Sequence, residues 1–222
     1  MTTDITVADD LLAHNADLQL IHTRDYQVHA FRTPDNNMVI RGAVRDTKPP
    51  FLYWPTDPDP LVIHLMAVEL DVTFGSMVIT AARVLFSEYP HVACPGIATR
   101  YQQLVGISIA RGYSHKVREL FGGPRGCSHT TALLQAMGPI AMQSLWSMRS
   151  ARMNDGSFEE RTDVIQNTGA SLMSNTCHVW EDGGEVSTMA ANGVDIGVPL
   201  PMVRRLTALG IDPIEFRRRQ ST

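Results

Sequence analysis

Two hydrophobic runs, at residues 61–72 and 77–86, constrain the fold of this chain more than any other feature. Both are rich in the aliphatic and β-branched residues that favour strands. Only a short break around Phe74-Gly75-Ser76 separates them. So short a connection joins neighbouring strands that run in opposite directions. The pair therefore predicts an antiparallel sheet.

A second predicted hairpin precedes this pair. Residues 18–31 alternate partly between apolar and polar side chains, as a strand does. The turn-forming segment Thr33-Pro34-Asp35-Asn36-Asn37 follows, so residues 38–44 are expected to return as a second strand. Five prolines within residues 48–60 predict an extended connection to the later strands. The four runs together predict an antiparallel meander.

Helical spacing replaces the strand pattern after residue 90. Apolar residues three and four apart predict short helices at 97–105 and 113–121, each ending near a glycine. A longer helix is expected from Cys127 or Ser128 to about Ser150, and Gly138-Pro139 is expected to kink or split it.

The two ends of the chain add little chemistry. Residues 1–16 are acidic and weakly patterned, which indicates a loose N-terminal arm. Residues 178–186 resemble a closing hairpin, and residues 200–222 a short helical basic tail. We therefore expect one α+β domain over residues 1–222. Its antiparallel sheet would consist of the N-terminal meander plus the C-terminal hairpin, with helices packed on one face.

Composition excludes several classes of protein. Hydrophobic residues make up 44% of the 222 residues, which is enough to bury a core, and the net charge of −4 gives no reason to bind nucleic acid. No uninterrupted apolar stretch is long enough for a membrane helix, and the N-terminus lacks a secretory pattern. Three scattered cysteines fit a reducing cytoplasm. Exposed sheet edges favour a homodimer.

Cys127 and His129 form the most concentrated chemical signal. They follow the glycine-rich segment Gly122-Gly123-Pro124-Arg125-Gly126 at an expected helix start. Unpaired backbone N–H groups and the helix dipole favour a thiolate there, so Cys127 is a candidate nucleophile or metal ligand. The alternative is a buried small thiol beside a capping histidine.

His64 and Cys94 extend this signal to two further segments. With Cys127 and His129 they offer the nitrogen and sulfur ligands that zinc or another divalent metal needs. Cys177-His178 offers a weaker addition. Each of these residues can instead be structural, because no close pair with zinc-finger spacing exists.

Acid–base and substrate-binding groups complete the candidate site. His64, His129 and Tyr101 are candidate proton-transfer residues. An anionic or aromatic substrate would be held by four residues that lie on or after the first hairpin: Arg32, Asp46, Lys48 and Trp54. A solvated sheet face and an ordinary core explain the same residues. Nucleotide, flavin and serine-hydrolase motifs are absent from the sequence.

Several of these motifs occur together in a known bacterial family. The most specific is Gly122-Gly123-x-x-Gly126-Cys127-Ser128-His129. Others precede and follow it: Gly42, Asp46-Thr47-Lys48, His64 with Met66, Cys94-Pro95, Tyr101-x-x-Leu104-x-Gly106 and Cys177-His178. Over residues 20–190 the chain resembles a family catalogued only as a domain of unknown function. The resemblance implies which residues matter and leaves the reaction open.

These observations predict an enzyme for a small apolar or aromatic organic substrate. We expect a lyase or hydrolase that works by acid–base or metal-assisted chemistry. The alternative is a non-catalytic metal or iron–sulfur scaffold, to which the order of sheet and helices is loosely similar. A third hypothesis places the working site at the charged residues after the first hairpin.

Overall fold

The computed structural model describes residues 17–110, 112–157 and 173–220. Contacts divide the chain into two compact units, Met1–Phe158 and Glu159–Thr222. The single domain expected from the sequence stays a prediction, and the N-terminal arm at 1–16 lies outside the described residues.

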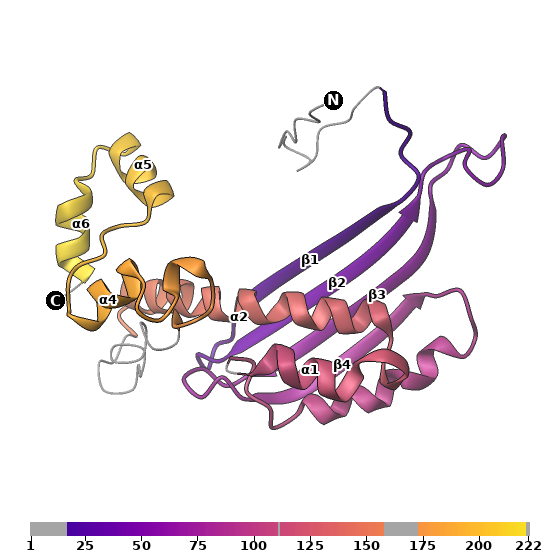
Figure 1. The fold of residues 1–222 in the computed structure, drawn as a ribbon, viewed down its shortest axis with the longest axis horizontal. Helices are drawn as coiled ribbons and strands as arrows, with labels where there is room; N and C mark the ends of the chain where they lie inside the picture. The colour runs from indigo at the N-terminus through magenta and orange to yellow at the C-terminus, as the bar shows by residue number, and fades with distance from the viewer. Residues whose placement is uncertain (1–16, 111, 158–172, 221–222) are drawn as a thin grey trace. The chain divides into compact units, whose positions relative to one another are not determined.

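Four antiparallel strands form the sheet of the first unit (Figure 1). They follow one another in chain order, which confirms the meander and the α+β class: β1 (Thr23–Arg32), β2 (Met38–Lys48), β3 (Leu61–Val72) and β4 (Ile79–Glu88). β1 begins five residues later than the alternation predicted.

Four helical segments follow the sheet in the first unit: η1 (Cys94–Leu104), α1 (Tyr113–Phe121), η2 (Gly123–Arg125) and α2 (Ser128–Asn154). α2 lies across β1, β2 and β3, and η1 runs beside β4 (Figure 1). Pro139 lies inside α2, which continues past it as one helix.

η1 is a 3₁₀ helix and covers most of the short helix predicted at 97–105. Tyr101 and Leu104, three residues apart, are both fully buried, whereas Val105 is 44% exposed. Side chains at i and i+3 line up in a 3₁₀ helix, so this spacing suits burial against β4.

The helix-covered face of the sheet is its apolar core. Met38, Ile40 and Val44 of β2 are buried, as are the facing positions of β3. Gly42 allows α2 to approach closely, because a Cβ atom there would lie 2.9 Å from Leu133 Cδ1. Helix α2 is therefore seated directly on the centre of the sheet.

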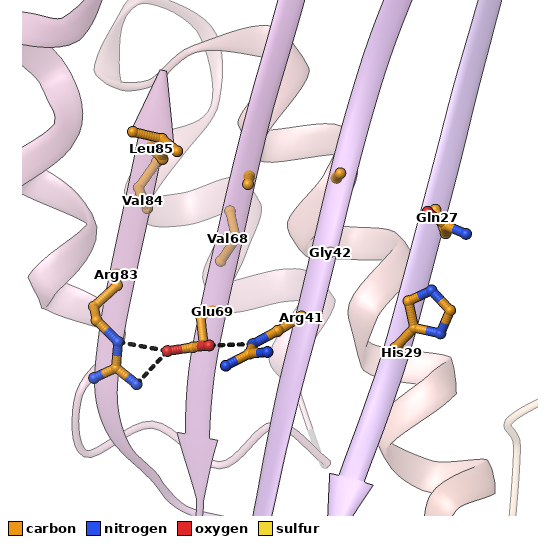
Figure 2. Close-up of a pocket in the computed structure, with 11 residues that line it drawn as sticks. Gln27, His29, Arg41, Gly42, Val68, Glu69, Arg83, Val84 and Leu85 are labelled. Atoms are coloured by element: carbon orange, nitrogen blue, oxygen red, sulfur yellow. Dashed lines mark hydrogen bonds and ion pairs between the residues drawn. The ribbon is translucent and has the colours of Figure 1, made fainter. Parts of the chain in front are cut away.

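The opposite face of the sheet is open and carries both charged and apolar side chains. A groove of about 390 Å³ crosses all four strands there, with Ala43 and Ala67 among its lining residues (Figure 2). Glu69 projects beside it and binds both Arg41 and Arg83. The alternation of faces thus separates a core from a charged surface, as a sheet with helices on one face requires.

The described part of the second unit, residues 173–220, is helical. It contains η3 (His178–Trp180), α4 (Glu185–Ala191), α5 (Leu200–Ala208) and α6 (Pro213–Gln220). The prediction of a closing hairpin at 178–186 is therefore wrong. An isolated two-stranded hairpin is marginally stable, whereas Glu185 in the first turn of α4 suits a helix N-terminus. No helix among the described residues is long and apolar enough to cross a bilayer.

Candidate active site

One cross-strand row at the end of the sheet sets up the site. The register places Arg24 of β1 opposite Asp46 of β2, and Asp46 opposite His64 of β3. Asp46 occupies the same alternating face as Val44, so its side chain points towards the helices. The pairing of β2 with β3 shifts register between Asp46 and Thr47. Such a β-bulge changes the direction in which nearby side chains point.

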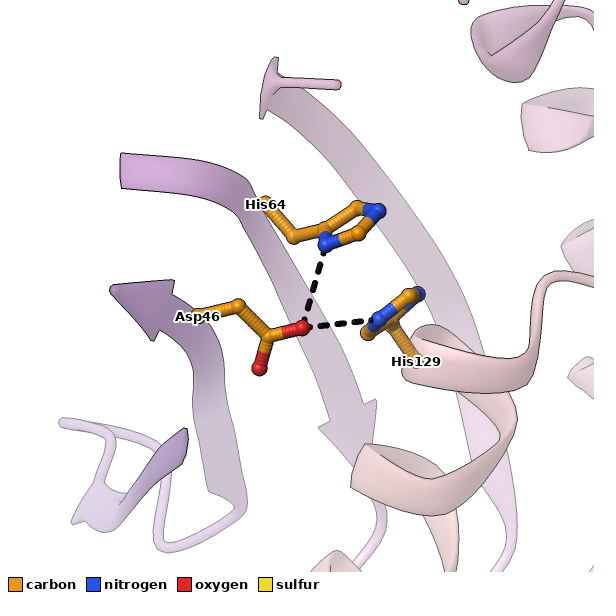
Figure 3. A group of neighbouring side chains, drawn as sticks. All are labelled: Asp46, His64 and His129. Atoms are coloured by element: carbon orange, nitrogen blue, oxygen red, sulfur yellow. Dashed lines mark hydrogen bonds and ion pairs between the residues drawn. The ribbon is translucent and has the colours of Figure 1, made fainter. Parts of the chain in front are cut away.

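Helix α2 completes the cluster with His129, the second residue of the helix. His129 Nε2 and His64 Nδ1 each lie 3.0 Å from the same oxygen, Asp46 Oδ2 (Figure 3). The Asp46 residue is 1% exposed, and the two histidine side chains are 19% and 14% exposed. The site is thus a buried carboxylate beneath two partly accessible imidazoles.

Arg24 holds the carboxylate from the other side. Its Nε and Nη2 donate to Asp46 Oδ1 and Oδ2 at 2.6 and 2.7 Å, and His22 Nε2 lies 3.5 Å from Oδ1. The hydrogen bond from Arg24 lowers the pKa of Asp46 well below its usual range, although burial opposes this. Asp46 is therefore a carboxylate at any pH near neutrality.

An ionised carboxylate decides which ring nitrogens carry hydrogen. It can only accept hydrogen bonds, so the nitrogens facing Asp46 are N–H donors. In a neutral imidazole the other nitrogen is then bare. In that neutral form the acceptors are His64 Nε2 and His129 Nδ1, and both project away from Asp46 (Figure 3).

The stacking of His64 on His129 disfavours a positive charge on both rings at once. The rings stack with centroids 3.8 Å apart and an interplanar angle of 28°. Burial lowers the pKa of His129, and the nearby His64 and Arg24 add to this, while Asp46 opposes it. His129 is therefore held as a neutral base.

Cys127 adjoins the outer nitrogen of His129, and Tyr101 contacts Cys127 in turn. Cys127 Sγ lies 3.8 Å from His129 Nδ1. The Cys127 N–H donates to the hydroxyl of Tyr101 at 2.8 Å, and Tyr101 itself is fully buried. Burial raises the pKa of Tyr101. Its contact with a backbone amide makes Tyr101 a residue that positions Cys127.

The same side chains could also bind a metal ion. Among the described residues, Asp46, His64 and His129 form a group whose ligand atoms all lie within 4.8 Å of one another. Arg24 argues against coordination by Asp46, because its guanidinium donates to the oxygen that both histidines face. A cation at that oxygen would displace hydrogen bonds and meet a fixed positive charge.

The remaining predicted site residues lie elsewhere. Arg32 is at the far end of β1 and binds Asp155 and Asn36. Eight residues of strand, about 26 Å, separate it from Arg24. Trp54 is 68% exposed in the segment after β2, and Cys94 begins η1 outside the metal-capable group.

Lys48 and Cys177 complete this set. Lys48 is the last residue of β2, beyond the bulge that follows Asp46. Cys177 is exposed and belongs to the second unit. The structure thus brings together His64, Asp46, His129, Cys127 and Tyr101, and it does not add the other predicted residues to that group.

Two residues of the cluster, His22 and Arg24, were not recognised as site residues from the sequence. A signal for Arg24 existed: a hairpin turning at 33–37 pairs residues whose numbers sum to about 70, and this places Arg24 opposite Asp46. The hairpin register by itself therefore predicts an ion pair between Arg24 and Asp46.

Fold and site together define an α+β protein in which a buried carboxylate holds two histidines at one end of an antiparallel sheet. The chain matches the model of a family described as "Protein of unknown function (DUF2889)" over residues 22–143, and it belongs to that family. The matched residues contain the whole cluster. No curated protein and no solved structure shows significant similarity to the chain.

Proposed function

We propose that this protein is an enzyme that transfers protons to or from a small organic substrate at His129 and His64, as a hydrolase or lyase. One observation carries the proposal: Asp46 Oδ2 accepts the inner N–H of both rings, while Arg24 keeps the carboxylate ionised. In a neutral ring the outer nitrogen therefore carries the lone pair, and both histidine side chains are partly exposed.

Each part of this arrangement suits general acid–base catalysis. A base must present a lone pair in a fixed direction, and a carboxylate on the opposite ring nitrogen provides this orientation. The lowered pKa of His129 keeps it unprotonated near neutral pH, so it can accept a proton. After accepting one, its imidazolium is stabilised by Asp46 at 3.0 Å.

The stacked partner, His64, supplies a second site for the same proton chemistry. One ring can act as base while the other donates, because two imidazolium ions at 3.8 Å repel each other. Hydrolases and lyases both need such a base and acid on neighbouring atoms of the substrate.

Metabolite depletion tests the proposal without a known substrate. Wild-type protein and the His129→Gln variant are incubated with a mixture of small molecules, and the compounds consumed are identified by mass spectrometry. The wild type is expected to consume at least one compound about 100-fold faster than His129→Gln does. The reason is that a positioned acid or base raises a reaction rate by about 10²–10⁴-fold.

His115→Gln is the matched control, because His115 is an exposed histidine on α1 whose side chain is 76% accessible. Its depletion profile should equal that of the wild type. Equal profiles for the wild type, His129→Gln and Asp46→Asn would contradict the proposal. Bound metal without turnover would support the scaffold alternative instead.

A further inference from the structure

We propose that Cys127 is a covalent nucleophile, activated by His129, and that the substrate is an ester or thioester of a small organic acid. This inference rests on the proposed function, which it narrows from proton transfer in general to acyl transfer. It depends on two successive contacts, from Cys127 to His129 and from His129 to Asp46.

The spacing of these contacts suits nucleophilic catalysis. Cys127 Sγ is 3.8 Å from His129 Nδ1, and His129 Nε2 is 3.0 Å from Asp46 Oδ2. A nucleophile, a base and a group that orients the base are the parts such sites share, and contacts to the base are often long without substrate. Because Asp46 fixes the N–H of His129 at Nε2, the bare Nδ1 faces the thiol.

The backbone holds Cys127 at the start of α2. Its N–H is bound by Tyr101, and its carbonyl oxygen accepts from the N–H of Thr131 in the first turn of the helix. Cys127 is the N-cap residue of α2, and its own side chain makes no capping hydrogen bond. An oxygen that becomes negative beside Cys127 is therefore close to the first-turn N–H groups of α2, which have no partner within the helix, and to the positive end of the dipole.

The first half-reaction forms a thioester. His129 Nδ1 takes the proton of the Cys127 thiol as Sγ attacks the carbonyl carbon, and the carbonyl π electrons move to oxygen. The carbonyl then re-forms, the bond to the leaving group breaks, and the alcohol or thiol leaves with the proton from His129.

Water completes the cycle in the second half-reaction. His129 Nδ1 takes a proton from water as its oxygen attacks the thioester carbon. The carbon–sulfur bond breaks, and Cys127 Sγ recovers the proton from His129. The sum is one substrate and one water converted to an acid and an alcohol or thiol, with no change of oxidation state.

Site-specific labelling distinguishes this role from that of an ordinary thiol. The full-length protein is treated with iodoacetamide near neutral pH, and the rate at each cysteine is read by peptide mass spectrometry. If exposure alone decided the rate, the exposed Cys177 would react faster than the half-buried Cys127. We expect Cys127 to react at least about tenfold faster than Cys177.

An acyl probe tests the covalent step itself. Treatment with p-nitrophenyl acetate should acetylate Cys127, and hydroxylamine should remove the acetyl group, as it does for thioesters. Cys127→Ala should abolish this adduct, and His129→Gln should slow its formation about 100-fold while leaving the thiol in place. Cys177→Ser is the matched control and should label like the wild type.

The outcomes separate the two proposals. If Cys127 labels no faster than Cys177 and forms no adduct, or if stoichiometric zinc shields it, the nucleophile inference is overturned. If Cys127→Ala then still depletes metabolites while His129→Gln does not, the proposed function survives alone. If neither variant differs from the wild type in depletion, both fail. Thermal melting of each variant establishes that it is folded.

Discussion

Asp46 and Glu69 are two carboxylates held between basic side chains on opposite faces of the same sheet. Glu69 binds Arg41 and Arg83, both permanent cations, on the open face (Figure 2). On the covered face Asp46 accepts hydrogen bonds from His64 and His129 (Figure 3) and from Arg24, and His22 Nε2 lies 3.5 Å from it. Only the second set of partners can exchange protons near neutral pH, so burial and partner type distinguish a site from a surface ion pair.

Removing the charge of Asp46 should have the largest effect. Asp46→Asn leaves Arg24 without its anion. It also places an amide NH₂, which is a donor, in a site where the surrounding groups donate to Asp46. We expect a loss of about 2–3 kcal/mol in the free energy of unfolding, because breaking a buried pair costs more than an exposed one and Arg24 is partly exposed. Urea denaturation measures this, and a change below about 0.5 kcal/mol would contradict the role assigned to Asp46.

Neighbouring residues 42 and 43 contrast the two faces without changing charge. Gly42→Val crowds Leu133 and Met137 of α2 and should destabilise the fold by about 1–3 kcal/mol. Ala43→Val lies in the open groove and should stay within about 0.5 kcal/mol of the wild type. The same urea assay compares them, and equal losses would mean that both faces are packed.

Neutralising Glu69 should cost less than neutralising Asp46. Glu69→Gln removes an exposed ion pair with two arginines, and such pairs are worth about 0.2–1 kcal/mol. The difference from the wild type should shrink in high salt, because solvent ions screen exposed charges. An effect as large as that of Asp46→Asn would remove the contrast between the two carboxylates.

Acid should abolish the small contribution of Glu69. Hydrogen bonds from Arg41 and Arg83 lower the pKa of Glu69 in the folded state. A lowered carboxyl pKa stabilises the fold fully above the unfolded pKa of about 4.3, and this stabilisation is lost as pH falls through the folded value. The urea midpoints of wild type and Glu69→Gln should therefore converge as pH falls below the unfolded value and through the lower folded value. A gap that widens in acid would contradict this sign.

Local sequence patterns were enough to predict the sheet and the long helix. Alternation and turn residues specified four strands in order, because hairpin partners are close in the chain and need no distant information. The same reasoning failed at residues 178–186, where a hairpin pattern became η3 and α4. The described residues of the second unit contain no strand with which an extended segment could pair.

For the candidate site, the sequence supplied the reactive side chains His64, Cys127 and His129, and it determined that a helix begins beside Cys127 and His129. Only the tertiary structure decided that His129, 83 residues away, meets Asp46, and that Asp46 orients the rings while Arg32 and Trp54 lie apart. The physical reason is that a carboxylate's role depends on its burial and on its partners, and both are set by packing a helix on a sheet.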